Sequence, residues 1–186
     1  MSSEEHLRIY LDFISRVRTS GHSMSILNGI EDYPTGSGRD LDIMVQDEAC
    51  IGQLFEIFKE VAARYGYQYT LIPSDIWGKR ILCVNETGDL VELHIYDELR
   101  TGLVSQRPDW NRIVWFDDMI PIDVNCMFFK RNVMKKLGGG YQHSIKAIDQ
   151  YCLKSISWLN LLRFKILTFQ GIKCISMKKF LVNFLE

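Results

Sequence analysis

The segment that decides the fold reads Gly36-Ser37-Gly38-Arg39-Asp40-Leu41-Asp42-Ile43-Met44-Val45. Acidic and apolar residues alternate in its second half, which is the period of a half-buried β-strand. Because residues two apart on a strand share a face, Asp40 and Asp42 point the same way. Two neighbouring carboxylates repel each other, and a divalent cation would remove that repulsion. Magnesium suits such oxygen ligands, although a solvated turn edge is the alternative interpretation of the pair.

The residues just before this strand are candidates for binding an anion. Gly36, Ser37 and Gly38 are expected to expose backbone N–H groups, where a phosphate could sit. By themselves these three residues form a turn more often than a phosphate-binding loop. Arg39 could contact the same phosphate or pair with Asp40. These four residues, 36–39, are the candidate cofactor-binding set.

A second alternating stretch, residues 90–96, supplies a third acid. Glu92 and His94 lie on its polar face, and apolar residues form the other. If this strand lies beside the first, Glu92 approaches Asp40 and Asp42. Three carboxylates on two neighbouring strands can hold two metal ions, which suit phosphoryl displacement. His94 is interpreted as a hydrogen-bonded side chain rather than a catalytic one.

Outward from these strands, periodicity and turn residues indicate a mixed sheet with helices packed on it, an α+β fold. Asp47 is a candidate helix cap, and residues 97–125 are expected to be mostly irregular. The expected helices span 4–18, 48–65 and 128–137, and the expected strands 24–27, 41–45, 67–72, 80–84, 90–96 and 121–125.

Composition excludes several classes of protein. The chain has 186 residues, 47% of them hydrophobic, and a net charge of −1, so neither disorder nor general nucleic-acid binding is expected. Its five cysteines form no CxxC pair, which favours reduced thiols in a cytoplasmic protein. The sequence contains no secretory leader pattern and no apolar run of membrane-spanning length.

The last part of the chain differs from the rest. Gly138-Gly139-Gly140 is a candidate hinge, which predicts one domain at 1–137 and a helical segment at 138–186. Residues 150–186 contain six Lys or Arg and one acid among many apolar residues. Such a helical tail needs a cover. Packing on the core is the favoured interpretation, and a membrane surface or a protein partner are the alternatives.

The residues Ser25-Ile-Leu-Asn-Gly-Ile-Glu-Asp-Tyr-Pro34, with the segment 36–45 that follows, resemble the signature of the nucleotidyltransferase superfamily, which has a polymerase-beta-like fold. More narrowly, they resemble bacterial nucleotidyltransferase-like proteins found with surface-polysaccharide genes. Residues 92–96 and 99–102 are similar to the family's third acidic strand and the turn after it. The resemblance covers about residues 20–130 and implies a nucleotidyltransferase-like mixed sheet flanked by helices.

The resemblance also implies an activity. Asp40 and Asp42 would bind two Mg²⁺ ions, and Glu92 would hold the ion nearer the acceptor and help to activate its hydroxyl. A nucleoside monophosphate would pass from a nucleoside triphosphate such as ATP to a small-molecule or sugar hydroxyl, with release of pyrophosphate. Asp40→Asn or Asp42→Asn is expected to abolish turnover with thermal stability unchanged or raised.

Two other functions remain open. The family's Gly-Ser at a helix start has only Asn28-Gly29 as a counterpart, which favours a non-catalytic regulatory or scaffold protein. A toxin–antitoxin nucleotidyltransferase, with a helical partner protein, is the third hypothesis.

Overall fold

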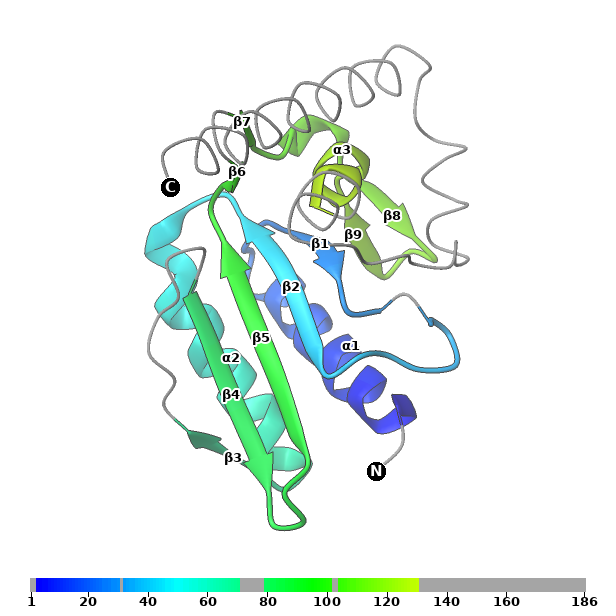
Figure 1. The fold of residues 1–186 in the computed structure, drawn as a ribbon, viewed down its shortest axis with the longest axis vertical. Helices are drawn as coiled ribbons and strands as arrows, with labels where there is room; N and C mark the ends of the chain where they lie inside the picture. Colours follow the sequence, from blue (N-terminus) through cyan, green and yellow to red (C-terminus); the bar gives the residue numbers. More distant parts are fainter. Residues whose placement is uncertain (1–2, 31, 71–78, 102–103, 131–186) are drawn as a thin grey trace, which may run out of the picture.

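A five-stranded mixed sheet forms the centre of the computed structural model, which describes residues 3–30, 32–70, 79–101 and 104–130 (Figure 1). The strand order is β1-β2-β5-β4-β3. β2 and β5 are parallel, and the other neighbours are antiparallel. The strands are β1 (Met24–Asn28), β2 (Asp40–Val45), β3 (Tyr67–Thr70), β4 (Lys79–Asn85) and β5 (Leu90–Tyr96). The expected α+β architecture is confirmed.

Two long helices cover one face of this sheet (Figure 1). They are α1 (Ser3–Thr19) and α2 (Ile51–Arg64), the second preceded by the 3-10 turn η1 (Glu48–Cys50). Asp47 begins that turn as predicted, because its side chain accepts a hydrogen bond from Ala49 N at 2.9 Å. The helices meet through aromatic rings, with Phe58 edge-on to Phe13 at 5.4 Å between centroids. The apolar residues at helical spacing therefore form the buried face of both helices.

Smaller elements follow β5. They are β6 (Leu99–Thr101) paired with β7 (Val104–Gln106), η2 (Trp110–Arg112), β8 (Val114–Phe116) paired with β9 (Ile120–Ile122), and α3 (Val124–Phe128). β9 and α3 contact β1 at the edge of the sheet (Figure 1). The Asp123 side chain caps α3 by accepting from Cys126 N at 2.7 Å, and Asp123 N donates to Ser25 Oγ at 2.6 Å. This anchor fixes the position of α3 relative to β1.

The sequence predictions for this region are partly wrong. Residues 97–125 were expected to be mostly irregular, but they contain four short strands. The helix expected at 128–137 begins instead at Val124, because Asp123 provides the cap. Residues 131–137, the hinge at 138–140 and the tail at 138–186 lie outside the described residues.

The structure bears on two expectations from composition, the reduced cysteines and the lack of a membrane-spanning run. Cys50, Cys83 and Cys126 are buried free thiols, and burial raises the pKa of Cys83 to about 11. In the described parts of the chain, each helix is too short or too polar to span a bilayer.

Candidate active site

The pairing of β2 with β5 brings the predicted acids together. The parallel register sets Asp40 opposite Glu92 and Asp42 opposite His94. Neighbouring strands lie about 4.8 Å apart, and residues two apart share a face, so the four side chains form one polar group. The alternate residues Leu41, Ile43, Leu93 and Ile95 are buried in the core. We call Asp40, Asp42 and Glu92 the acid cluster.

Asp42 is the most buried member of the acid cluster, with 3% of its surface exposed. Lys130 Nζ lies 2.8 Å from Asp42 Oδ2, and His94 Nδ1 lies 3.1 Å from Asp42 Oδ1. Burial alone would raise the pKa of Asp42, but the charges of Lys130 and His94 outweigh burial and hold that pKa well below its usual range. Asp42 Oδ1 is buried and faces His94 Nδ1 in an ion-pair contact that lacks hydrogen-bond geometry. Each carboxylate oxygen of Asp42 therefore lies beside a basic side chain.

His94 links the two strands of the acid cluster. Its Nε2 lies 2.7 Å from Glu92 Oε1, while its Nδ1 faces Asp42. Burial lowers the pKa of His94, yet its contacts with the two carboxylates outweigh burial and raise that pKa above the ordinary value. Arg80 NH1 also approaches Glu92 Oε1, at 3.4 Å. Sequence reasoning interpreted His94 as a hydrogen-bonded side chain, and the structure agrees.

Lys130 is a site residue that the sequence did not reveal. It follows α3, is 8% exposed, and reaches the acid cluster from the face opposite α1 and α2. Its Nζ also donates to Tyr96 OH at 3.0 Å and lies 4.1 Å from the centre of the Tyr96 ring. Burial would lower the pKa of Lys130, but the Asp42 charge raises it. Lys130 is therefore a buried ammonium matched to a buried carboxylate.

Asp42 and Glu92 contact basic side chains of the chain itself. Repulsion between the carboxylates was expected to require a metal ion, but these side chains also reduce it. We call Arg80, His94 and Lys130 the basic partners.

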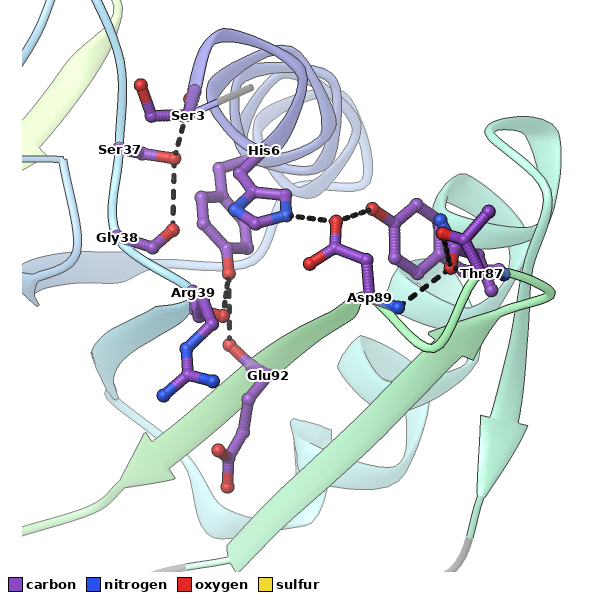
Figure 2. Close-up of polar contacts among 11 residues, drawn as sticks. Ser3, His6, Ser37, Gly38, Arg39, Thr87, Asp89 and Glu92 are labelled. Carbon is purple, nitrogen blue, oxygen red and sulfur yellow. Dashed lines mark hydrogen bonds and ion pairs between the residues drawn. The ribbon is translucent and has the colours of Figure 1, made fainter. Parts of the chain in front are cut away.

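The backbone beneath the acid cluster is tied to α1. Tyr10 OH donates to Arg39 O and lies 3.5 Å from Glu92 O, while Glu92 N donates to Arg39 O at 2.8 Å. Figure 2 shows Arg39 and Glu92 meeting at this point. Gly29 lies against the same backbone, since a Cβ there would come within 2.2 Å of Asp40 O. Both contacts fix the backbone from which the Asp40 and Glu92 side chains project.

The loop before β2 does not expose the expected donors. Gly36 N donates to Asp32 O, Ser37 N to Ser3 O and Gly38 N to Gly29 O, at 2.8 to 3.1 Å. Figure 2 shows Ser37 beside Ser3 at the start of α1. All three N–H groups are therefore used within the chain, contrary to the expectation that they face an anion. Arg39 is exposed. The assignment of residues 36–39 to a cofactor remains a prediction.

A divalent cation fits the chemistry of the acid cluster but not its present arrangement. Oxygen donors and an unsatisfied buried Asp42 oxygen suit a hard cation. Within the described ranges, however, no three His, Cys, Asp or Glu side chains gather closely enough to hold a metal ion. The basic partners lie against the Asp42 and Glu92 carboxylates, so a cation at the acid cluster would compete with them.

Two cavities of the described part lie elsewhere. One of about 320 Å³ is lined partly by Trp110 and Trp115, and another of about 610 Å³ partly by Asp47 and Gln53. No residue of the acid cluster lines either cavity.

Comparison with known proteins identifies the fold. No protein-family model and no curated protein sequence matches the chain. The solution structure of the antibiotic-resistance factor ANT(2'')-Ia matches with a TM-score of 0.54 at 9% identity, covering 96% of this chain and 98% of the other. The lincomycin-bound lincosamide antibiotic adenylyltransferase LnuA matches with a TM-score of 0.42 at 14% identity, covering 79% and 93%. The first match confirms the predicted nucleotidyltransferase-like fold.

Proposed function

We propose that this protein is a magnesium-dependent nucleotidyltransferase that moves a nucleoside monophosphate to a hydroxyl of a small molecule or sugar. The observation that carries the proposal is the parallel register of β2 and β5, which sets Glu92 opposite Asp40 and His94 opposite Asp42. The likeness to ANT(2'')-Ia supports the fold on which such chemistry would be built. A nucleoside triphosphate substrate is consistent with a cytoplasmic protein.

The chain's own groups would perform the following steps. Asp40, Asp42 and Glu92 would hold Mg²⁺, which when bound neutralises charge on the triphosphate. Glu92 accepts the proton of the acceptor hydroxyl, and that oxygen forms a bond to the α-phosphorus. The bond from the α-phosphorus to the pyrophosphate oxygen breaks, and its electron pair leaves with pyrophosphate. In the cation-free protein, His94 and Arg80 hold the Glu92 carboxylate through contacts at 2.7 and 3.4 Å.

The acceptor is described only by its chemical class. Glu92 requires an acceptor that presents a hydroxyl to the polar face of β2 and β5. Small molecules and sugars that carry hydroxyl groups are therefore the acceptors to test first. The surface-polysaccharide setting implied by the sequence resemblance remains a prediction.

Transfer of label is the direct test. The protein is incubated with Mg²⁺, each triphosphate labelled at the α-phosphate, and a panel of hydroxyl-bearing small molecules and sugars. We expect labelled acceptor and pyrophosphate in equal amounts, and a loss of at least about a hundredfold in Asp42→Asn. The matched control is Asp118→Asn, because Asp118 is exposed and has a positive φ of 55° that asparagine tolerates. Equal rates in the two variants would contradict the assignment.

A non-catalytic regulatory or scaffold protein is the second candidate. Two observations favour it: positive side chains already contact Asp42 and Glu92, and the backbone N–H groups of residues 36–38 are used within the chain. A scaffold of this kind would bind no triphosphate in the presence of Mg²⁺. Calorimetric titration with each triphosphate therefore separates the two candidates.

A further inference from the structure

We propose that Lys130 is a built-in competitor for the cation site: its ammonium and a divalent cation compete for the Asp42 carboxylate. In the cation-free protein Lys130 holds Asp42, and cation binding displaces Lys130 from Asp42 Oδ2. The inference rests on the proposed function, because it concerns the same carboxylate.

The contact between Lys130 and Asp42 is close and dry. Nζ lies 2.8 Å from Oδ2, and the two residues are 8% and 3% exposed. Water screens such a pair poorly, so each charge depends on the other. Loss of Lys130 without a replacement cation therefore lowers the stability of the folded protein.

Lys130 and a divalent cation cannot share Asp42 without strong repulsion. The two oxygens of one carboxylate are about 2.2 Å apart, so both cations would lie within a few ångströms of each other. Asp42 Oδ1 has no partner with hydrogen-bond geometry, but His94 Nδ1 lies 3.1 Å from it, so a cation there must displace His94 as well. The cation and the Lys130 ammonium therefore weaken each other's contact with Asp42.

Tyr96 gives Lys130 a second place to bind. Its hydroxyl accepts from Nζ at 3.0 Å, and its ring centre lies 4.1 Å from Nζ. A lysine that leaves Asp42 keeps both contacts within reach of small side-chain rotations. The displaced ammonium therefore remains beside the site, where it attracts the negatively charged triphosphate. Tyr96 lies on β5 two residues beyond His94. The same strand therefore carries His94, which contacts Asp42, and Tyr96, which contacts Lys130.

The test compares Mn²⁺ affinity in the full chain and in Lys130→Met. Methionine keeps an unbranched apolar chain and removes the charge. We expect Lys130→Met to unfold at a lower temperature than wild type without metal, and its unfolding midpoint to rise more steeply with Mn²⁺. The Kd for Mn²⁺, measured by calorimetry, should fall at least tenfold.

Four further variants sharpen the test. Lys130→Arg keeps the charge and should bind Mn²⁺ about as weakly as wild type, whereas Lys130→Gln is a polar neutral variant that serves if Lys130→Met fails to fold. Lys79→Met removes an exposed lysine paired with Glu48 and should leave the Kd unchanged. Adding Asp42→Asn to Lys130→Met should abolish the gain.

The outcomes separate this inference from the proposed function. If wild type binds Mn²⁺ through Asp42 but Lys130→Met and Lys130→Gln bind it no tighter, the competition is overturned and the cation site stands. If no protein of the series shows Mn²⁺ binding that depends on Asp42, both the competition and the cation site are overturned.

Discussion

Asp42 and Asp89 are two paired carboxylates with different environments. Asp89 Oδ2 accepts from His6 Nε2 at 2.9 Å and from Tyr67 OH at 3.0 Å, and 23% of its side chain is exposed (Figure 2). These bonds join α1, β3 and the turn before β5. Asp42, by contrast, is buried, with Lys130 2.8 Å from one carboxylate oxygen and His94 3.1 Å from the other. Asp89 is a partly exposed carboxylate held by hydrogen bonds, whereas Asp42 is a buried carboxylate held by basic side chains.

The largest expected effect comes from Asp42→Asn. It leaves the Lys130 ammonium buried without its counter-ion, so the free energy of unfolding should fall by roughly 3–5 kcal/mol. This reverses the expectation from carboxylate repulsion, which predicted unchanged or raised stability. Urea unfolding followed by circular dichroism measures it.

Asp40→Asn is the matched control for that measurement, because Asp40 is only half-buried. Its stability should be unchanged or slightly raised. Equal stability in Asp42→Asn and wild type would show that the Lys130 pair contributes nothing to the fold.

An intermediate effect is expected from Gly29→Ala. Gly29 has a φ of +108°, and an added Cβ would lie 2.2 Å from Asp40 O, a backbone atom that cannot move aside alone. The free energy of unfolding should fall by about 2 kcal/mol or more, and the start of β2 should shift. Thermal unfolding measures the loss.

Gly52→Ala serves as the comparison for Gly29→Ala. Gly52 lies in α2 with nothing within 4 Å of an added Cβ, so alanine should raise stability by about 0.5–1 kcal/mol. Similar midpoints for the two variants would rule out a steric role for Gly29.

The smallest effect concerns Asp89 and acid. Burial alone would raise the pKa of Asp89, but hydrogen bonds from His6 and Tyr67 outweigh burial and lower it in the folded protein. The unfolded chain therefore binds the proton at higher pH. The resulting stabilisation is complete above the unfolded pKa of about 3.9 and is lost as pH falls through the lower folded pKa.

Asp89→Asn should remove that part of the acid dependence and lower stability at pH 7 by about 1 kcal/mol. Urea midpoints between pH 2.5 and 6 for both proteins provide the measurement. Parallel curves would contradict the role of Asp89, and Mn²⁺ binding should not change.

Regular alternation and helical spacing predicted the main elements of the fold. Residues 90–96 became β5, and residues 4–18 became most of α1. The region after β5 was poorly predicted, because strands of three residues such as β8 and β9 are too short to display a period. Asp123 was a readable capping signal that the expected strand at 121–125 obscured.

The candidate site was predicted in part for a related physical reason. Strand alternation reveals which residues share a face, so Asp40, Asp42 and Glu92 could be grouped. It does not reveal which distant cation reaches that face, and Lys130 arrives only through the packing of α3 on β1. Likewise, composition indicated a turn at residues 36–38. It did not reveal that the N–H group of Ser37 would donate to the carbonyl of Ser3 at the start of α1.

Calorimetric titration of Mg²⁺ with a non-hydrolysable triphosphate into wild type and Asp40→Asn, Asp42→Asn and Glu92→Gln tests the shared role of the acid cluster most directly. We predict one saturable, metal-dependent binding event in wild type that is weakened at least tenfold in each variant. Binding of equal strength in all four proteins, or none in wild type, would contradict it.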